Sequence, residues 1–226
     1  MQDCIPNDHA RQVSATYYLD EAMSARDAPD VVVDLGCGPG TSAELFRRHD
    51  PHVRWVGIDI GDSPESRNRA TGEDLVVIYD GVHLPLGTNS VPLIYSKHVF
   101  EHVRQPRELL LEITRVLRPG GTFIGDTSQL EPYHSLSLWN YTPYGFRVLV
   151  EEAGLTLEEI RPGIDGITLI RRAYDGRPPE YSKYFVSASP LNEEIDAWGR
   201  ETKRRPALIN LRKLTFCGQF AFRVRK

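Results

Sequence analysis

The sequence predicts an α/β fold in which helices cover both faces of an open, mostly parallel sheet. An apolar, β-branched run at 31–35 shows no polar alternation, which is typical of a strand buried on both faces of a parallel sheet. Strand-like and helix-like segments then alternate as far as residue 126, which indicates βα units. At 226 residues, the chain fits one domain with a sizeable core.

The first half of the chain supplies most of the predicted sheet. Residues 7–26 carry apolar groups at helical spacing and predict one or two helices before the first strand, placed where they could cover a cofactor. The remaining elements are expected as strands at 31–35, 54–59, 75–79, 92–96 and 121–126, helices at 41–49 and 106–117, and a helix or turn near 64–70.

The second half is marked by helix signals. Thr142 and Pro143 suit the N-cap and first position of a helix that ends before Gly154. A strand is expected at 155–161, little regular structure at 162–189, and helices starting at Pro190 and Pro206, the latter reaching about residue 216. The alternation of Phe220, Phe222 and Val224 with less apolar residues predicts a final strand.

The chain is therefore expected to be one domain with four parts. These parts are an N-terminal helical lid at 1–29, a core at 30–161, an insertion with helices at 162–217 and the last strand at 218–226.

The stretch VVVDLGCGPG, residues 31–40, joins the first strand to a glycine-rich loop. Gly36, Gly38 and Gly40 remove Cβ atoms where the chain turns and where a ligand could lie against the backbone. The following helix would direct its free N–H groups at a polar or negative part of that ligand. The sequence therefore predicts a ligand cradle.

Two cofactor classes use such a loop. A dinucleotide fingerprint is G-x-G-x-x-G, whereas Gly40 comes one residue early, and Pro39 has no N–H to offer a pyrophosphate. Asp34 would repel a pyrophosphate but suits a ligand with positive charge. An NAD-linked oxidoreductase is therefore the weaker of the two interpretations.

Further stretches follow in a characteristic order: WVGIDI at 55–60, YDGVHLPL at 79–86, SKHVFEHV at 96–103 and RVLRPGGTFIGD at 115–126. With the glycine loop, they make the chain resemble the class I S-adenosylmethionine-dependent methyltransferases, and among them the type 11 methyltransferase family. The resemblance implies a seven-stranded, Rossmann-like sheet whose last strand is antiparallel. It also implies S-adenosylmethionine as cofactor and S-adenosylhomocysteine as product.

The resemblance also assigns roles to residues that follow the strands. Asp59 would accept hydrogen bonds from the ribose hydroxyls, a role that its place at a strand end, 23 residues after Gly36, also favours. Pro92 departs from the family, which usually has an acid there. The expected cofactor-binding residues are Asp34, Gly36, Cys37, Gly38, Gly40, Asp59, Ile60, Asp80, Gly81, Ser96 and Lys97.

Asp80 and Gly81 have a simpler interpretation, because Asp-Gly is a common turn sequence. By the resemblance, Asp80 would instead bind the adenine amino group.

The motif HVFEH, residues 98–102, matches the H-x-x-E-H pattern of some zinc hydrolases. A zinc site of that kind needs a helix of several turns, but the motif directly follows a strand and Pro106 cuts it short. No third ligand is evident downstream. The sequence therefore predicts no metal and activity that persists in a chelator.

Histidine is the natural general base for a hydroxyl acceptor. His134 is ranked first because it lies in a polar loop after the fifth strand, where open α/β sheets bind ligands. His98 is ranked second and His102 third.

Composition limits the other function classes. The net charge of −4 argues against a broad nucleic-acid surface, and neither a run of about 18 apolar residues nor a leader is present. Cys4, Cys37 and Cys217 are far apart and form neither a disulfide framework nor a zinc knuckle. A soluble, cytoplasmic protein is expected.

The expected activity is O-methylation of a small polar, sugar-like or natural-product acceptor. Basic residues at 203–205, 212–213 and 223–226 are either solvated surface or a site for a phosphate or carboxylate on that acceptor. An RNA or protein methyltransferase and a non-catalytic cofactor-binding protein remain as alternatives, and the sequence does not indicate an oligomeric state.

Overall fold

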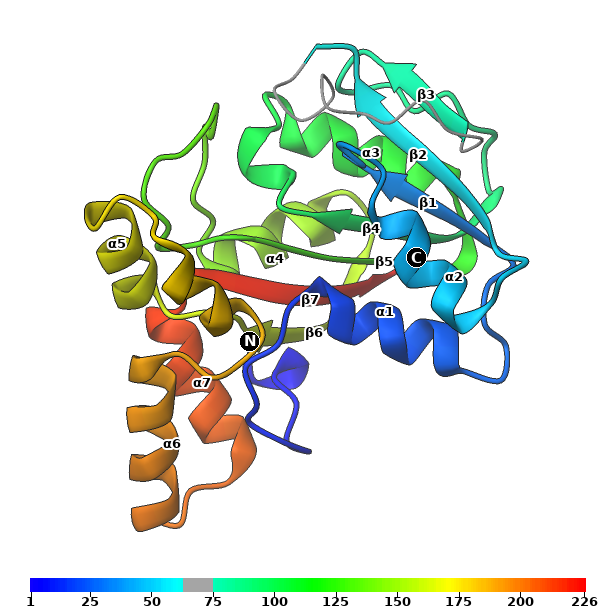
Figure 1. The fold of residues 1–226 in the computed structure, drawn as a ribbon. Coiled ribbons are helices and arrows are strands. Elements are labelled where there is room, and N and C mark those ends of the chain that lie inside the picture. Colours follow the sequence, from blue (N-terminus) through cyan, green and yellow to red (C-terminus); the bar gives the residue numbers. More distant parts are fainter. Residues whose placement is uncertain (63–74) are drawn as a thin grey trace.

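A seven-stranded sheet forms the centre of the computed structural model, which describes residues 1–62 and 75–226 (Figure 1). The strand order is β3-β2-β1-β4-β5-β7-β6. The strands are β1 Val31–Leu35, β2 Arg54–Ile60, β3 Leu75–Tyr79, β4 Val91–Lys97, β5 Leu117–Ser128, β6 Thr156–Pro162 and β7 Gln219–Arg225. The helix or turn expected near 64–70 lies outside the described residues.

Strand directions confirm the predicted fold class. Parallel pairing joins β3, β2, β1, β4 and β5, whereas β7 is antiparallel to both of its neighbours, β5 and β6. The last strand of the chain thus lies inside the sheet. Its residues Phe220, Phe222 and Val224 face one layer of the core, and Ala221 faces the other.

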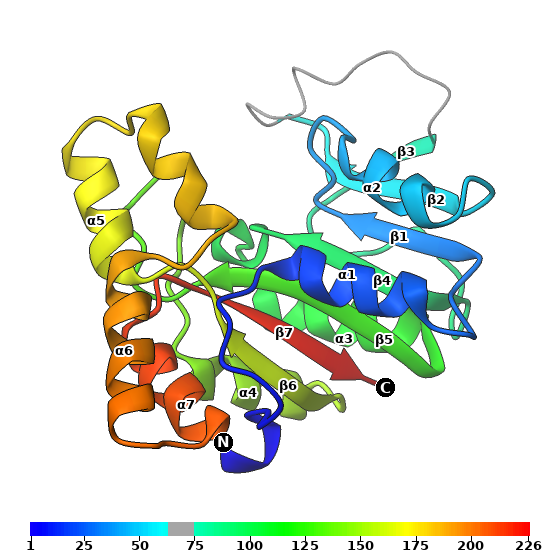
Figure 2. The same cartoon turned by 60° about the horizontal axis from the view of Figure 1, so that its bottom comes forward.

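Helices cover both faces of this sheet (Figures 1 and 2). On one face, α1 Ala15–Ser24 and α2 Ser42–His49 pack over β1, β4 and β5. On the other face, α3 Pro106–Val116 and α4 Pro143–Glu152 enclose the larger apolar core. The predicted cap of α4 is confirmed, since the Thr142 hydroxyl accepts the Gly145 N–H at 3.0 Å.

The remaining helices gather beside β6 and β7, as both views show (Figures 1 and 2). They are α5 Gly166–Tyr174, the 3-10 helix η4 Pro179–Phe185, α6 Pro190–Glu201 and α7 Pro206–Phe216. The starts of α6 and α7 agree with the sequence prediction. None of the helices in the described ranges is long and apolar enough to cross a membrane.

The expectation of little regular structure at 162–189 is wrong. Asp165 caps α5 by accepting the Thr168 N–H at 2.7 Å and the Thr168 hydroxyl at 2.8 Å. Leu169 packs against the backbone at Gly218, where a Cβ would lie 2.4 Å from the leucine methyl. The helix is short but amphipathic, so its sequence carried a periodic signal that the prediction missed.

Two boundaries also differ from expectation. Residues 7–14 contain no helix, and the N-terminal segment includes only α1 and the short 3-10 helix η1 Gln2–Cys4. Strand β4 begins at Val91 in spite of Pro92, because the register with β5 shifts between Val91 and Leu93. Such an irregularity accommodates a residue that cannot donate to the ladder.

Candidate active site

The glycine loop lies where the chain order of the sheet reverses. Strands β1 and β4 are neighbours, but the helix after β1 covers one face and the helix after β4 covers the other. A crevice between diverging loops at the carboxyl ends of the strands is the usual ligand site of open α/β sheets. The residues of the predicted cofactor site come from these loops.

The glycines of the loop adopt conformations that side chains disfavour. Gly36, Gly38 and Gly40 have φ values of +74°, +52° and +84°. A Cβ on Gly36 would lie 2.3 Å from a methyl group of Val99, in the segment after β4. The cofactor loop therefore contacts the segment that carries the HVFEH motif.

Asp59 at the end of β2 is brought to this loop, as predicted. Its buried carboxylate accepts the Gly38 N–H and the Ile60 N–H, both at 2.8 Å. Asp59 thus combines a negative charge with a fixed position beside bare backbone. This is the chemistry that ribose hydroxyls require.

Asp34 and Cys37 are both buried at the same strand end. The Asp34 carboxyl group accepts a hydrogen bond from the Ser42 hydroxyl, which in turn accepts the Trp55 indole N–H at 3.2 Å. Burial raises the pKa of Asp34 to about 7. Positive charge in a bound ligand would favour its ionised form.

Asp80 and Gly81 form a turn after β3. The Asp80 carboxylate accepts the backbone N–H groups of Val82 and His83, and the ring of His83 lies 2.7 Å away. The hydrogen bond with His83 lowers the pKa of Asp80 to about 2. Asp80 and Gly81 therefore form the turn that their sequence indicates.

Ser96 and Lys97 end β4 beside the glycine loop. Ser96 is buried, and its hydroxyl has no hydrogen-bond partner in the described parts of the chain, whereas Lys97 is exposed. A buried hydroxyl without a partner costs free energy. It fits a polar ligand atom, so the residues at this edge fit the predicted cofactor.

A buried carboxylate, Glu101, lies next to the cofactor loop. It belongs to the short 3-10 helix η3 Phe100–His102 and is 0% exposed. Its oxygens accept the Thr127 hydroxyl at 3.0 Å and the Ser128 hydroxyl at 3.3 Å, both from the end of β5. Burial raises the pKa of Glu101.

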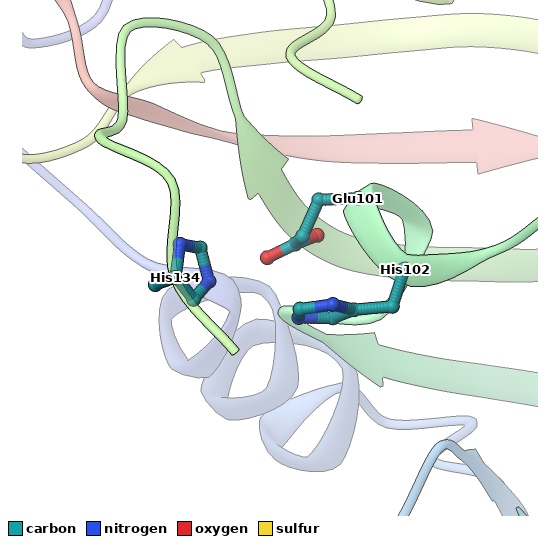
Figure 3. Close-up of side chains that lie close together, drawn as sticks. All are labelled: Glu101, His102 and His134. Carbon is teal, nitrogen blue, oxygen red and sulfur yellow. The ribbon is translucent and has the colours of Figure 1, made fainter. Parts of the chain in front are cut away.

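Two histidines approach Glu101 from different segments (Figure 3). His102 follows it in η3, and His134 comes from the loop at 129–142, with ring centroids 5.4 Å apart. One ligand atom from each histidine and one from Glu101 lie within 4.8 Å of one another. The ring nitrogen Nδ1 of His134 lies 3.1 Å from the Pro132 carbonyl oxygen.

His98 adjoins the same cluster from the end of β4. It has a φ of +54°, a left-handed conformation that is uncommon outside glycine. Its Nδ1 lies 3.4 Å from Asp126 and 3.7 Å from Glu101, without a hydrogen bond to any described residue. The structure therefore brings all three predicted histidines to one site.

Hydrogen bonds hold the loop at 129–142 on η3. The Glu101 carbonyl accepts the N–H groups of Leu138 and Trp139 at 2.7 and 3.1 Å. The Trp139 indole donates to the Val103 carbonyl at 2.8 Å, and the Tyr141 hydroxyl to the Phe100 carbonyl at 3.0 Å. These bonds fix the position of His134 relative to Glu101.

Sequence reasoning missed Glu101 and Asp126 as members of this site. Glu101 entered the sequence analysis only as part of the HVFEH motif, and η3 is too short for the helix that a zinc hydrolase of that pattern needs. Asp126 carried the same signal as Asp59, an acid near the end of a buried strand. The fold also brings His134 close to the motif, a proximity that the sequence did not make evident.

The basic residues at the end of the chain do not reach this site. Antiparallel β7 places Arg225 opposite Thr122, at the amino end of β5, while the site lies at the carboxyl end. Arg223 and Arg225 form ion pairs with Glu158, and the Lys226 amino group donates to main-chain carbonyl oxygens. The charged groups of these residues therefore make contacts within the sheet and lie away from the candidate site.

Comparison with known proteins agrees with this geometry. Residues 33–125 match the family model Methyltransf_11, described as a methyltransferase domain. An uncharacterized methyltransferase of Mycobacteroides abscessus is 37% identical over 120 residues, which cover 49% of this chain and 45% of that protein.

Solved structures share the fold. An S-adenosylmethionine-dependent methyltransferase from Mesorhizobium loti has a TM-score of 0.58 at 18% identity, covering 94% of this chain and 98% of that one. A putative methyltransferase of Haloferax volcanii, solved in complex with the Trm112 activator, has a TM-score of 0.57 at 24% identity, covering 92% and 87%.

Residues 33–125 thus match a methyltransferase domain, and the chain shares its fold with solved S-adenosylmethionine-dependent methyltransferases. This assignment agrees with the glycine spacing, which departs from the dinucleotide fingerprint. The chain spans between 31% and 47% of the length of the first curated relatives it matches.

Proposed function

We propose that this protein transfers a methyl group from S-adenosylmethionine to a hydroxyl oxygen of a small polar, sugar-like acceptor. The observation that carries the proposal is the contact between the glycine loop and the HVFEH segment through Gly36 and Val99. This contact sets the cofactor loop beside the cluster of His98, Glu101 and His134. A methyl donor and a group that handles protons would therefore meet at one edge of the sheet.

The cofactor binds through groups that the chain already positions. The Asp59 carboxylate holds the ribose, the Asp80 and Gly81 turn borders the adenine, and Ser96 offers its unpartnered hydroxyl to the amino-acid part. Bound S-adenosylmethionine supplies a methyl group that its sulfonium centre makes electrophilic.

The chain's part in catalysis is to hold the acceptor oxygen in line with the methyl–sulfur bond. Orientation of this kind contributes roughly 7–11 kcal/mol in well-placed intramolecular reactions. The loop at 129–142 frames the acceptor, because its hydrogen bonds to η3 fix it at the carboxyl edge.

A histidine takes the proton of the acceptor hydroxyl. The sequence ranks His134 first, but the geometry favours His98. The Nδ1 of His98 has no hydrogen bond to a described residue, while the ring of His134 faces His102, with centroids 5.4 Å apart. His98 also directly follows the strand that carries the cofactor residues Ser96 and Lys97.

The test is incubation of the protein with methyl-labelled S-adenosylmethionine and a fractionated lysate, followed by mass spectrometry. Label in a small hydroxylated compound, with one equivalent of S-adenosylhomocysteine, is the expected result. Label in RNA or protein would contradict the proposed acceptor. Binding of the cofactor without transfer to any fraction would contradict catalysis.

A further inference from the structure

Three side chains in the cluster converge without bonding to one another. Glu101, His102 and His134 place one ligand atom each within 4.8 Å, yet in the described structure no hydrogen bond or ion pair joins Glu101 to either ring. We propose that these residues form a divalent-metal site of the two-histidine, one-carboxylate type. The inference rests on the proposed function for its role in catalysis, although the binding itself does not.

The side chains suit a metal in their chemistry. Glu101 is wholly buried and accepts hydrogen bonds from two neutral hydroxyls, so a bound cation would stabilise its charged form. Metal ions bind imidazole nitrogen at about 2.0–2.1 Å and carboxylate oxygen at about 2.0–2.2 Å. Small movements of the two partly exposed histidine side chains would bring the three ligand atoms to these distances from one ion.

Hydrogen-bond partners orient two of the proposed ligands, His134 and Glu101, as is usual in metal sites. Nδ1 of His134 faces the Pro132 carbonyl at 3.1 Å, so a proton there would leave Nε2 with a free lone pair. The Glu101 carboxylate is oriented by the Thr127 and Ser128 hydroxyls. Such outer contacts hold ligands in place and tune their basicity.

Rigid segments hold the ligands together. Glu101 is fixed to the end of β5 through its side chain, and its carbonyl accepts two N–H groups of the loop that carries His134. The indole of Trp139 adds a third bond from this loop, to Val103. The site is therefore preorganised by both of its segments.

Two histidines and one carboxylate leave open coordination positions and favour Zn²⁺, Fe²⁺, Co²⁺ or Mn²⁺ over Ca²⁺. Two adjacent hydroxyl oxygens of the acceptor fit those positions, and coordination lowers the pKa of a bound hydroxyl. The proton passes to His98, which is not a ligand. The oxygen forms a bond to the methyl carbon as the carbon–sulfur bond breaks, and its electron pair stays on sulfur.

The experiment titrates chelator-treated full-length protein with Co²⁺ alone, without S-adenosylmethionine. Calorimetry and visible absorption report binding. The expected result is one equivalent of Co²⁺, with affinity lowered at least about tenfold in Glu101→Gln and in His134→Ala. His49→Ala is the matched control, because His49 forms a histidine–carboxylate contact with Asp20 on another part of the surface.

Equal affinity of wild type and a folded His134→Ala protein would overturn the proposal, as would the absence of binding to wild type. His134→Ala decides the matter if Glu101→Gln fails to fold, because His134 lies in a partly exposed loop. Methyl transfer without Co²⁺ binding would remove the metal site and leave the proposed function standing. Co²⁺ binding without transfer to any acceptor would support the metal site and contradict the proposed function.

Discussion

Asp59 links two parts of the proposed cofactor site through one side chain. Its carboxylate accepts the N–H of Gly38 and lies at the end of β2, so the glycine loop and the neighbouring strand share a charged group. A ribose that binds here exchanges water for a charge-assisted hydrogen bond. The position of this acid beside the loop was predicted from the sequence, because a strand end fixes it.

Asp59→Asn should weaken binding of S-adenosylmethionine while the protein stays folded. The amide keeps one acceptor for the Gly38 N–H but removes the charge that holds the ribose hydroxyls. The expected loss is about 1.5–3 kcal/mol, as for hydrogen bonds to charged groups. Isothermal calorimetry measures it, with exposed Asp27→Asn as control. Unchanged affinity in a folded Asp59→Asn protein would refute the ribose assignment.

Asp34 should make stability depend on pH. Its folded pKa is raised to about 7 from 3.8 by burial, so the unfolded chain ionises first. Its contribution is full below about pH 4 and is lost as pH rises to about 7. At 1.36 kcal/mol per pKa unit, the loss is on the order of 4 kcal/mol at most.

Urea unfolding of wild type and Asp34→Asn at pH 4 to 8 tests this sign. The free energy of unfolding of wild type should fall relative to that of the variant across this range. A difference between the two proteins that does not change with pH would contradict the assignment.

His98→Asn should reduce turnover without a loss of cofactor affinity. Asparagine tolerates the left-handed φ of +54° but cannot accept a proton at neutral pH. The expected reduction in kcat is roughly 10²–10⁴-fold, the usual contribution of a positioned base. Steady-state kinetics with the acceptor found in the lysate measures it. Wild-type turnover by the variant would show that His98 is not the base.

At the scale of elements, the turn after β1 and the segment after β4 pack directly on each other. Gly36→Ala should destabilise the protein because its Cβ would lie 2.3 Å from the Val99 methyl. Gly120→Ala is a matched control, since Gly120 has the same φ of +74° but no atom within 4 Å of an added Cβ. The difference between the two variants isolates the contact, at about 1–3 kcal/mol.

Chemical denaturation of Gly36→Ala, Gly120→Ala and Gly36→Ala with Val99→Ala provides the measurement. The added Val99→Ala change should recover part of the loss. Equal destabilisation of the two single variants would show that the loop and the HVFEH segment do not pack against each other.

Elements with strong local signals were predictable from the sequence. Strands β1 and β3 are buried or apolar runs, and α7 begins at Pro206 and ends at Phe216 as expected. Helix α5 was missed although it is amphipathic and begins after the capping residue Asp165; its packing against Gly218, about fifty positions away, could not be predicted. The spacing of apolar residues indicates which face of a helix is buried. It does not indicate which distant residue that face packs against.

At the scale of the whole molecule, the last strand completes the core. Phe222 of β7 is fully buried and packs against Phe146 and Phe123, with ring centroids 4.5 and 5.0 Å away. Phe222→Ala should lower the free energy of unfolding by about 3–5 kcal/mol. Phe216→Ala, at a half-exposed position, should cost less than about 1 kcal/mol.

Equilibrium denaturation of both phenylalanine variants checks this expectation. Similar losses at the two positions would mean that β7 does not form the centre of the packed layer. The inward alternation of β7 was itself visible in the sequence, and the family resemblance implied its antiparallel direction, but its place between β5 and β6 was not predicted.

The cofactor half of the site was more predictable than the acceptor half. Glycines and acids that end strands meet at one edge by the rules of parallel sheets, so Gly38 and Asp59 could be paired in advance. Glu101 and His134 come from a 3-10 turn and an irregular loop, more than thirty residues apart in the chain. Only the hydrogen bonds between these two segments show that the side chains converge.

The most direct test of the account is a crystal structure of the protein with S-adenosylhomocysteine. The account predicts the ribose on Asp59, the adenine beside the turn at Asp80, and the sulfur facing the cluster of His98, Glu101 and His134. A ligand bound elsewhere, or one whose sulfur points away from this cluster, would contradict it.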